Sequence, residues 1–117
     1  LNEQVLFRAG ETRLIHDEIA NDTASLRKVL KSVSSINTLQ PLFSACCSSP
    51  NIHVFIGDEI GIESLRNCSI VAKSFFKDNK VAGVMAVVGP KRMDYQSVIL
   101  SVDLSTNILT SALNHQQ

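Results

Sequence analysis

The segment 81–88 (VAGVMAVV) carries no charge and no polar side chain. It is short and rich in β-branched valine, which is typical of a strand that is buried on both faces or lies at the centre of a sheet. Gly89 and Pro90 are predicted to end this strand, because glycine allows a sharp turn and proline has no N–H to donate to a neighbouring strand. Asp94 then occupies the position of an N-cap, and a helical pattern continues from it to Leu113.

Two further strands are predicted upstream of this segment. Residues 52–56 (IHVFI) alternate at strand spacing, and residues 69–76 (SIVAKSFF) form the second candidate. A loop with one helical turn near 63–66 is expected between them. The polar residues 77–80 (KDNK) predict a tight turn, after which 81–88 returns antiparallel as a hairpin.

The first half of the chain is predicted to be mainly helical. Residues 5–10 suggest a short strand that enters the domain, and 12–19 suit a short helix with one buried side. Apolar residues in 26–36 follow the spacing of an amphipathic helix. The pattern pauses at Asn37-Thr38, and 39–46 then presents one more apolar face before Ser, Pro and Asn residues break it.

The apolar positions of the last helix form two rows. One sheet face cannot easily cover both rows, so part of this helix is predicted to meet a partner subunit, although a wide apolar face can also be covered within one chain. The first row comprises Tyr95, Val98, Ile99, Val102, Thr106, Leu109 and Leu113, and the second row comprises Leu100, Leu104, Ile108 and Ala112.

The order of these elements predicts an α+β domain with an antiparallel sheet and helices packed on one side. The 117 residues, 44% of them hydrophobic, suit a single domain with its own core. Eleven basic residues balance eleven acidic ones, and a neutral chain is a poor candidate for binding nucleic acid by itself. Three cysteines are an odd number and favour a reducing, intracellular setting. No apolar run reaches membrane-spanning length, and the start at Leu1 predicts a fragment of a longer protein.

No catalytic motif is present, whether a nucleophile elbow, a phosphate-binding loop or a zinc-protease helix. His16-Asp17-Glu18 are adjacent and would point in different directions from a helix, so a solvated face is expected. Cys46-Cys47 and Cys68 lack zinc-finger spacing and are expected to be small buried or half-buried thiols. The segment 57–61 (GDEIG) lacks the alternating oxygen ligands of a calcium loop and is expected to be a turn. We therefore expect no enzyme activity, metal or cofactor.

The sequence allows two interpretations of the basic pair before the last helix, and two of the glycine inside the 81–88 strand. Lys91 and Arg92 at the entry of the last helix could hold an anionic ligand beside free N–H groups, or Arg92 could pair with Asp94 or Asp103 and fix the turn. Gly83 indicates either a bulge or the close approach of a helix to the sheet.

Four segments resemble the C-terminal half of heat-inducible transcription repressors of the HrcA family, in the same order and at similar spacing. These are 56–59 (IGDE), 67–71 (NCSIV), 81–84 (VAGV) and 88–95 (VGPKRMDY). Effector domains of IclR-type regulators carry a similar strand, turn and helix and are the alternative, in which the domain binds a small organic effector. The ending Met93-Asp94-Tyr95 and the segment 56–59 favour the first family.

The resemblance implies a GAF-like fold with a long C-terminal helix. It implies that residues 1–117 are a C-terminal regulatory and dimerisation domain, and that an N-terminal winged-helix DNA-binding domain lies outside this chain. Such repressors are cytoplasmic homodimers that bind the CIRCE inverted repeat and repress chaperone operons, and the GroEL chaperonin keeps them active. We expect the motif to hold the turn and the start of the helix rather than perform chemistry, through Gly89, Pro90, Arg92, Met93, Asp94 and Tyr95.

Overall fold

The structure of the chain is a computed structural model that describes residue 27, residue 31 and residues 35–115. The strand predicted at 5–10, the helix at 12–19 and most of the helix at 26–36 lie outside the described residues. The described part contains a three-stranded antiparallel sheet with helices, so the predicted α+β class is confirmed.

The sheet has the order β1-β2-β3, with β1 at His53–Ile56, β2 at Cys68–Lys77 and β3 at Lys80–Pro90. The strands β2 and β3 form the predicted hairpin. Its two-residue turn places Asp78 and Asn79 at φ angles of 53° and 65°, a left-handed conformation that aspartate and asparagine tolerate best after glycine. The turn is therefore determined by its local sequence.

Within residues 35–115, the segment 81–88 is neither at the centre of the sheet nor buried on both faces, although the sequence predicted one or the other. Among residues 35–115, β2 is the central strand and β3 is an edge strand whose valines are half-buried. The strand also does not end at residue 88, since Ser69 pairs with Gly89 and Cys68 pairs with Pro90. Proline is tolerated there because an edge strand has one side without a ladder.

Gly83 lies beside a bulge and beneath an aromatic ring. Phe75 pairs with Gly83 and Phe76 with Val81, which leaves Ala82 as the extra residue of β3. A Cβ atom on Gly83 would lie 2.5 Å from Cζ of Phe75. The bulge is confirmed, and the close approach comes from a ring of the neighbouring strand instead of from a helix.

One face of the sheet is covered by α3 (Ile36–Cys47) and two short 3₁₀ helices, η2 (Gly57–Ile60) and η3 (Glu63–Leu65). The hydroxyl of Ser35 accepts a bond from Thr38 N at 3.3 Å, so the helix begins just before the predicted pause at 37–38. The predicted helical turn in the loop corresponds to η3. The core beneath these elements consists of Leu39, Leu42, Cys46, Ile60, Leu65, Cys68, Ile70 and Ala72.

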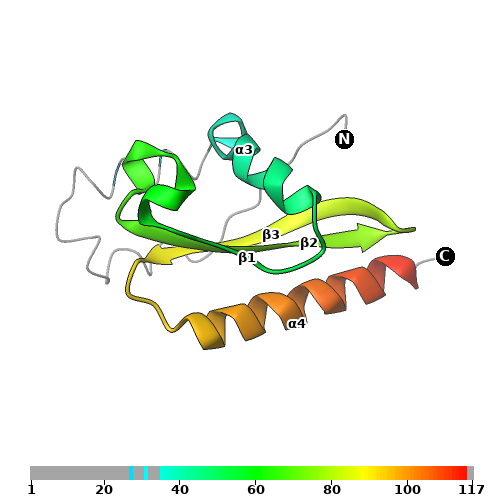
Figure 1. The fold of residues 1–117 in the computed structure, drawn as a ribbon. Helices are drawn as coiled ribbons and strands as arrows, with labels where there is room; N and C mark the ends of the chain where they lie inside the picture. The colour runs from blue at the N-terminus through cyan, green and yellow to red at the C-terminus, as the bar shows by residue number, and fades with distance from the viewer. Residues whose placement is uncertain (1–26, 28–30, 32–34, 116–117) are drawn as a thin grey trace.

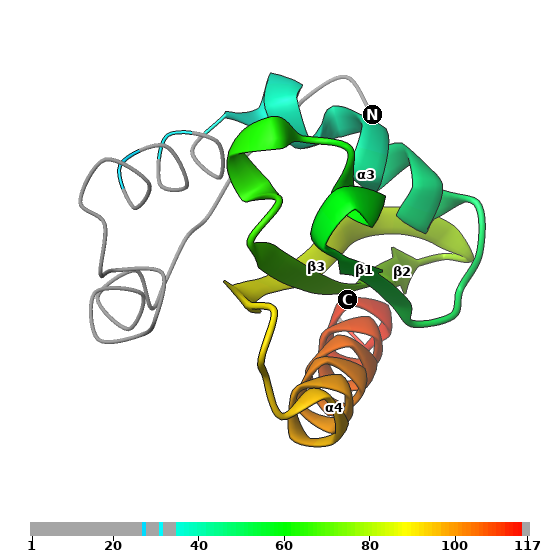
Figure 2. The same cartoon turned by 60° about the vertical axis from the view of Figure 1, so that its left-hand side comes forward.

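The long helix α4 (Tyr95–Asn114) packs on the opposite face, as Figure 1 and Figure 2 show, so the prediction that the helices lie on one side is wrong. The cause is the alternation of side chains along β2. Ile70 and Ala72 enter the core beneath α3, whereas Lys73 points to α4. Val71, next to Ile70 in the strand and therefore on the other face, is 0% exposed, so β2 needs a covering layer on each face.

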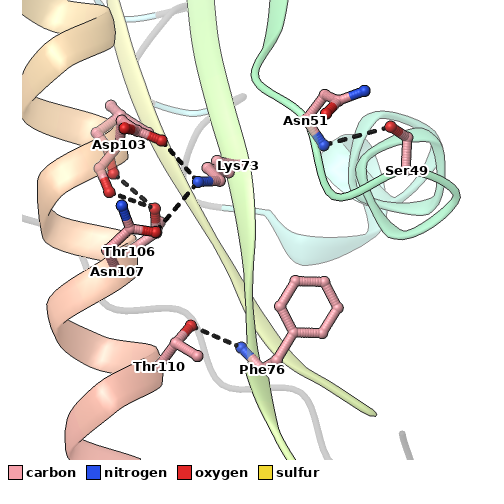
Figure 3. A network of polar contacts seen from close by, with 9 residues as sticks. Ser49, Asn51, Lys73, Phe76, Asp103, Thr106, Asn107 and Thr110 are labelled. Atoms are coloured by element: carbon pink, nitrogen blue, oxygen red, sulfur yellow. Dashed lines mark hydrogen bonds and ion pairs between the residues drawn. The ribbon is translucent and has the colours of Figure 1, made fainter. Parts of the chain in front are cut away.

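A polar contact joins β2 to α4 within this second layer (Figure 3). The ammonium of Lys73 lies 2.6 Å from the Asp103 carboxylate and donates to Asn107 Oδ1 at 3.3 Å. The Lys73 side chain is mostly buried, and a buried charge needs such partners. This ion pair fixes the register of α4 along the central strand.

Candidate functional site

The segment 89–95 leaves β3 and folds back onto the beginning of β2. Lys91 N donates to Asn67 O at 3.3 Å, and the buried hydroxyl of Ser69 donates to Pro90 O at 2.9 Å. Backbone atoms of the turn are therefore hydrogen-bonded to the beginning of the central strand, and the turn does not extend freely into solvent.

Two close approaches complete this arrangement. Gly57 has a φ of +61°, and a Cβ atom on it would lie 2.7 Å from Cε of Lys91. A Cβ atom on Gly89 would lie 2.8 Å from Sδ of Met93. The segments 56–59, 67–71 and 88–95, which are distant in the sequence, are therefore brought together at one end of the sheet.

Asp94 caps α4. Its carboxylate accepts bonds from Ser97 N at 3.2 Å and from the Ser97 hydroxyl at 2.7 Å. The phenol of Tyr95 donates to Lys91 O, and Tyr95 N donates to Met93 O at 2.9 Å. The hydroxyl and the backbone amide of Ser97 hold the pKa of the Asp94 carboxyl below its ordinary value. The geometry supports a role for these residues in holding the turn and the helix start, which stays a prediction until their effect on stability is measured.

We expect Asp94→Ala to lower the melting temperature by a small amount at pH 7 and Asp94→Asn to lower it less, because asparagine also caps helices. Since folding lowers the pKa of Asp94, its charge stabilises the fold above the ordinary carboxyl pKa, and this contribution is lost as the pH falls through the lowered value. The difference between wild type and Asp94→Ala should therefore shrink in acid. Thermal melts from pH 7 to pH 2 check this, and an unchanged melting temperature for Asp94→Ala at pH 7 would rule out the capping role.

One of the two interpretations of Arg92 was an ion pair with Asp94 or Asp103, and the structure does not show it. Asp103 is held by Lys73, and within residues 35–115 the ion pairs include none with Arg92, whose side chain is exposed. Lys91 is also exposed, with its side chain near Gly57. Because the Asp94 carboxylate already supplies negative charge at the start of α4, the arrangement does not favour an anionic ligand there.

Gly57 and Gly61 both have left-handed backbone conformations but differ in their surroundings, so their substitutions can be compared. Gly57 and Gly61 have φ angles of +61° and +77°, but only at Gly57 would an added Cβ atom meet other atoms within 4 Å. We expect Gly61→Ala to cost about 1 kcal/mol of stability, as a left-handed alanine does, and Gly57→Ala to cost about 1 kcal/mol more because Lys91 must move. Urea unfolding followed by circular dichroism measures both, and equal costs would show that Lys91 moves freely.

Two of the three cysteines are buried thiols, as the sequence suggests, whereas the expectation is wrong for Cys47. Cys46 and Cys68 are buried in the core beneath α3, and Cys47 is exposed. Burial raises the pKa of each buried thiol from 9.0 to about 11, with a smaller contribution from neighbouring Cys47 in the case of Cys46. In the described part of the chain, no group of three His, Cys, Asp or Glu side chains is placed to hold a metal ion. No helix of that part is long and apolar enough to span a membrane.

We expect Cys47 to react with a thiol reagent in the native protein at pH 8, and Cys46 and Cys68 to react only after denaturation. The raised pKa values also predict a loss of stability between about pH 9 and about pH 11, because the unfolded thiols ionise first. Mass spectrometry of the alkylated protein checks the labelling. Rapid modification of Cys68 in the native state would contradict the observed packing.

The second row of α4 is directed away from the sheet. Leu100, Leu104 and Ile108 are 58%, 53% and 67% exposed, whereas Val102 and Thr106 of the first row are 1% exposed. The single charged residue of the helix, Asp103, is engaged by Lys73. The side of α4 that faces away from the sheet is therefore an uncharged surface with three large aliphatic side chains.

Comparison with known proteins relates this geometry to a family. The family model described as the HrcA protein C terminal domain matches residues 1–99. The chain belongs to the HrcA family. Proteins named heat-inducible transcription repressor HrcA are similar to it: that of Methylococcus capsulatus is 36% identical over 92% of this chain, and that of Laribacter hongkongensis is 34% identical over 91%. The chain spans 31% of the length of either relative.

A solved structure supports the same fold. The crystal structure of a hypothetical protein superposes with a TM-score of 0.76 at 24% identity, and the match covers 88% of this chain and 30% of the other. At this identity the likeness concerns the fold alone. The HrcA family match also removes the reason for the alternative of an IclR-type effector domain.

Several contacts at the site were not identified from the sequence. Ser69 and Gly57 belong to the resembling segments, but their contacts to Pro90 and Lys91 join residues far apart in the chain. For Lys73 the sequence held a signal, because it is the single charged residue of the predicted strand 69–76 and a charge on a buried strand needs a partner. That partner, Asp103, lies on a helix 30 residues away.

Proposed function

We propose that this chain is the C-terminal regulatory and dimerisation domain of a heat-inducible transcription repressor. The observation that carries this proposal is the HrcA family match over residues 1–99, with the 89–95 motif folded onto two of the other segments that the resemblance identified, 56–59 and 67–71. In this role the domain holds two subunits so that two DNA-binding domains meet an inverted repeat, since two-fold protein symmetry matches two-fold operator symmetry.

The second row of α4 is the surface we assign to the subunit contact. Three aliphatic side chains more than half exposed on one helix are unusual for a surface with no partner. Because this side of α4 carries no free charge, two copies related by a two-fold axis can meet there without bringing like charges together. The domain would thus contribute to a cytoplasmic homodimer.

Operator binding would require the remainder of a longer polypeptide. The net charge of this chain is zero, so it lacks the excess of Lys and Arg that binds phosphates. The operator in this proposal is the CIRCE inverted repeat upstream of chaperone operons, and the GroEL chaperonin raises the active fraction. The response to heat would follow from a marginally stable domain or subunit contact that loosens on warming.

The test is fluorescence anisotropy of the full-length protein on a labelled CIRCE repeat, with and without GroEL. The 117-residue chain and a scrambled repeat are the controls. We expect binding by the full-length protein, a larger active fraction with chaperonin, and no binding by the short chain. Absence of binding by the full-length protein under every condition would refute the repressor role of this protein.

A further inference from the structure

The last two turns of α4 bury none of their side chains fully. Val102 and Thr106 are the buried residues of this helix, and every side chain from Asn107 to Asn114 is at least partly exposed. Of the apolar side chains in this part, only Leu109 and Leu113 are half-buried. A helical segment with little buried apolar area has a low local stability, so its attachment to the sheet depends on polar contacts.

These polar contacts reach the end of the β2–β3 hairpin. Thr110 Oγ1 accepts a hydrogen bond from Phe76 N at 3.1 Å (Figure 3). The carboxamide of Asn114 uses both of its groups, because Nδ2 donates to Phe76 O at 3.1 Å and Oδ1 accepts from Asp78 N at 3.0 Å. A carboxamide can thus satisfy a backbone C=O and a backbone N–H together, as a paired strand would. The end of the helix and the tip of the hairpin are therefore one connected unit.

This unit has a boundary toward the core on both of its parts. In the hairpin, the bulge at Phe75 and Phe76 interrupts the ladder between β2 and β3, and the turn residues 77–80 beyond it are all exposed. In the helix, Thr106 is the last buried residue. The two bonds of Asn114 are exposed as well, so water competes for them and each contributes little net stability.

We propose that residues 107–114 of α4 and the hairpin tip 76–80 form a latch, which opens as one unit on warming, below the temperature at which the domain unfolds. Opening breaks the bonds of Thr110 and Asn114 and separates the end of the helix from β2. Ile108, which is 67% exposed and belongs to the second row of α4, lies on this segment. Its displacement weakens the subunit contact, a step that rests on the proposed function. The latch gives the proposed heat response a defined location in the fold.

Residue-resolved hydrogen exchange of the full-length protein and its Asn114→Ala variant tests the latch. The amide of Phe76 is the main reporter, because its acceptor is Thr110 and not Asn114. If the latch is one unit, Asn114→Ala should speed exchange of Phe76 and of the amides at 107–114 by the same factor, at least roughly 5-fold, and leave Val71 unchanged. Faster exchange of Asp78 alone would show a local loss of one bond and overturn the proposal. Equal acceleration of Val71 would show that the segment opens only with the whole domain and would also overturn it.

The link to the subunit contact is tested by sedimentation of the full-length protein as a function of temperature at a fixed concentration. Asn114→Ala should lower the temperature at which the subunits separate by several degrees. Ser111→Ala is the matched control, because Ser111 is an exposed residue of the same turn, and it should leave that temperature unchanged. The same temperature in both variants would overturn the link between latch and subunit contact. Neither measurement uses operator DNA, so a failure here is distinguishable from a failure of the repressor role.

Discussion

Replacing Leu104 by Lys should separate the subunits of the full-length protein while leaving the domain folded. Leu104 is 53% exposed and lies in the middle of the second row of α4, so a single subunit tolerates a lysine there. In a two-fold contact over this row, the lysine of each subunit would enter an apolar surface without a partner charge. We expect the dimer to weaken by about 30-fold or more, as for a residue at the centre of an interface. Analytical ultracentrifugation over a concentration series measures this.

Ile56→Lys is the matched control. Ile56 is also a large aliphatic residue with substantial exposure, 40%, but it belongs to the edge strand β1 and not to α4. Its replacement adds the same charge and should leave both the dimer and the circular dichroism spectrum unchanged. If both variants dimerise like wild type, the second row of α4 is not the subunit contact.

The elements that local sequence determines were predicted correctly. The hairpin turn was predicted from the polar run 77–80, and the structure places Asp78 and Asn79 there in left-handed conformations, which both residues tolerate. The two rows of α4 follow from helical periodicity alone, and the first row faces the sheet while the second is exposed, as expected. Such features need only neighbours within a few residues.

The errors concern arrangements that depend on distant parts of the chain. The position of β3 in the sheet is set by which strands pair with it, and its apolar pattern cannot distinguish a central strand from an edge strand. The division of the helices between two faces could have been inferred from β2. Ile70 and Val71 are adjacent apolar residues that point in opposite directions in a strand, which favours a covering layer on each side, and both are buried in the structure.

The candidate site shows the same limit. The cap at Asp94 is a local feature and was visible in the sequence, because the carboxylate and Ser97 are three residues apart. The contacts from Ser69 to Pro90 and from Gly57 to Lys91 join segments that only the fold brings together. Resemblance to a family identified these segments without indicating that they touch.

Leu65→Ala should strongly destabilise the domain. The Leu65 side chain is 0% exposed, and its removal leaves a cavity in the core that connects η3 to α3 and β2. We expect the free energy of unfolding to fall by about 2–5 kcal/mol, a substantial part of the stability of an ordinary domain. Leu100→Ala is the matched control, because the same substitution at a side chain that is 58% exposed should change folding by less than about 0.5 kcal/mol. Urea unfolding followed by circular dichroism measures both values.

The variants Leu65→Ala and Leu100→Ala also distinguish two explanations of the proposed heat response. If warming inactivates the protein by loosening this domain, Leu65→Ala should lower the temperature at which operator binding is lost by several degrees, and Leu100→Ala should leave it unchanged in a saturating excess of protein. If warming acts on the subunit contact instead, Leu100→Ala should lower that temperature at limiting protein concentration, because it removes apolar area from the second row. Anisotropy on the labelled repeat as a function of temperature, without chaperonin, distinguishes the two. A loss of binding at the same temperature in both variants and in wild type would place the heat sensor outside this domain.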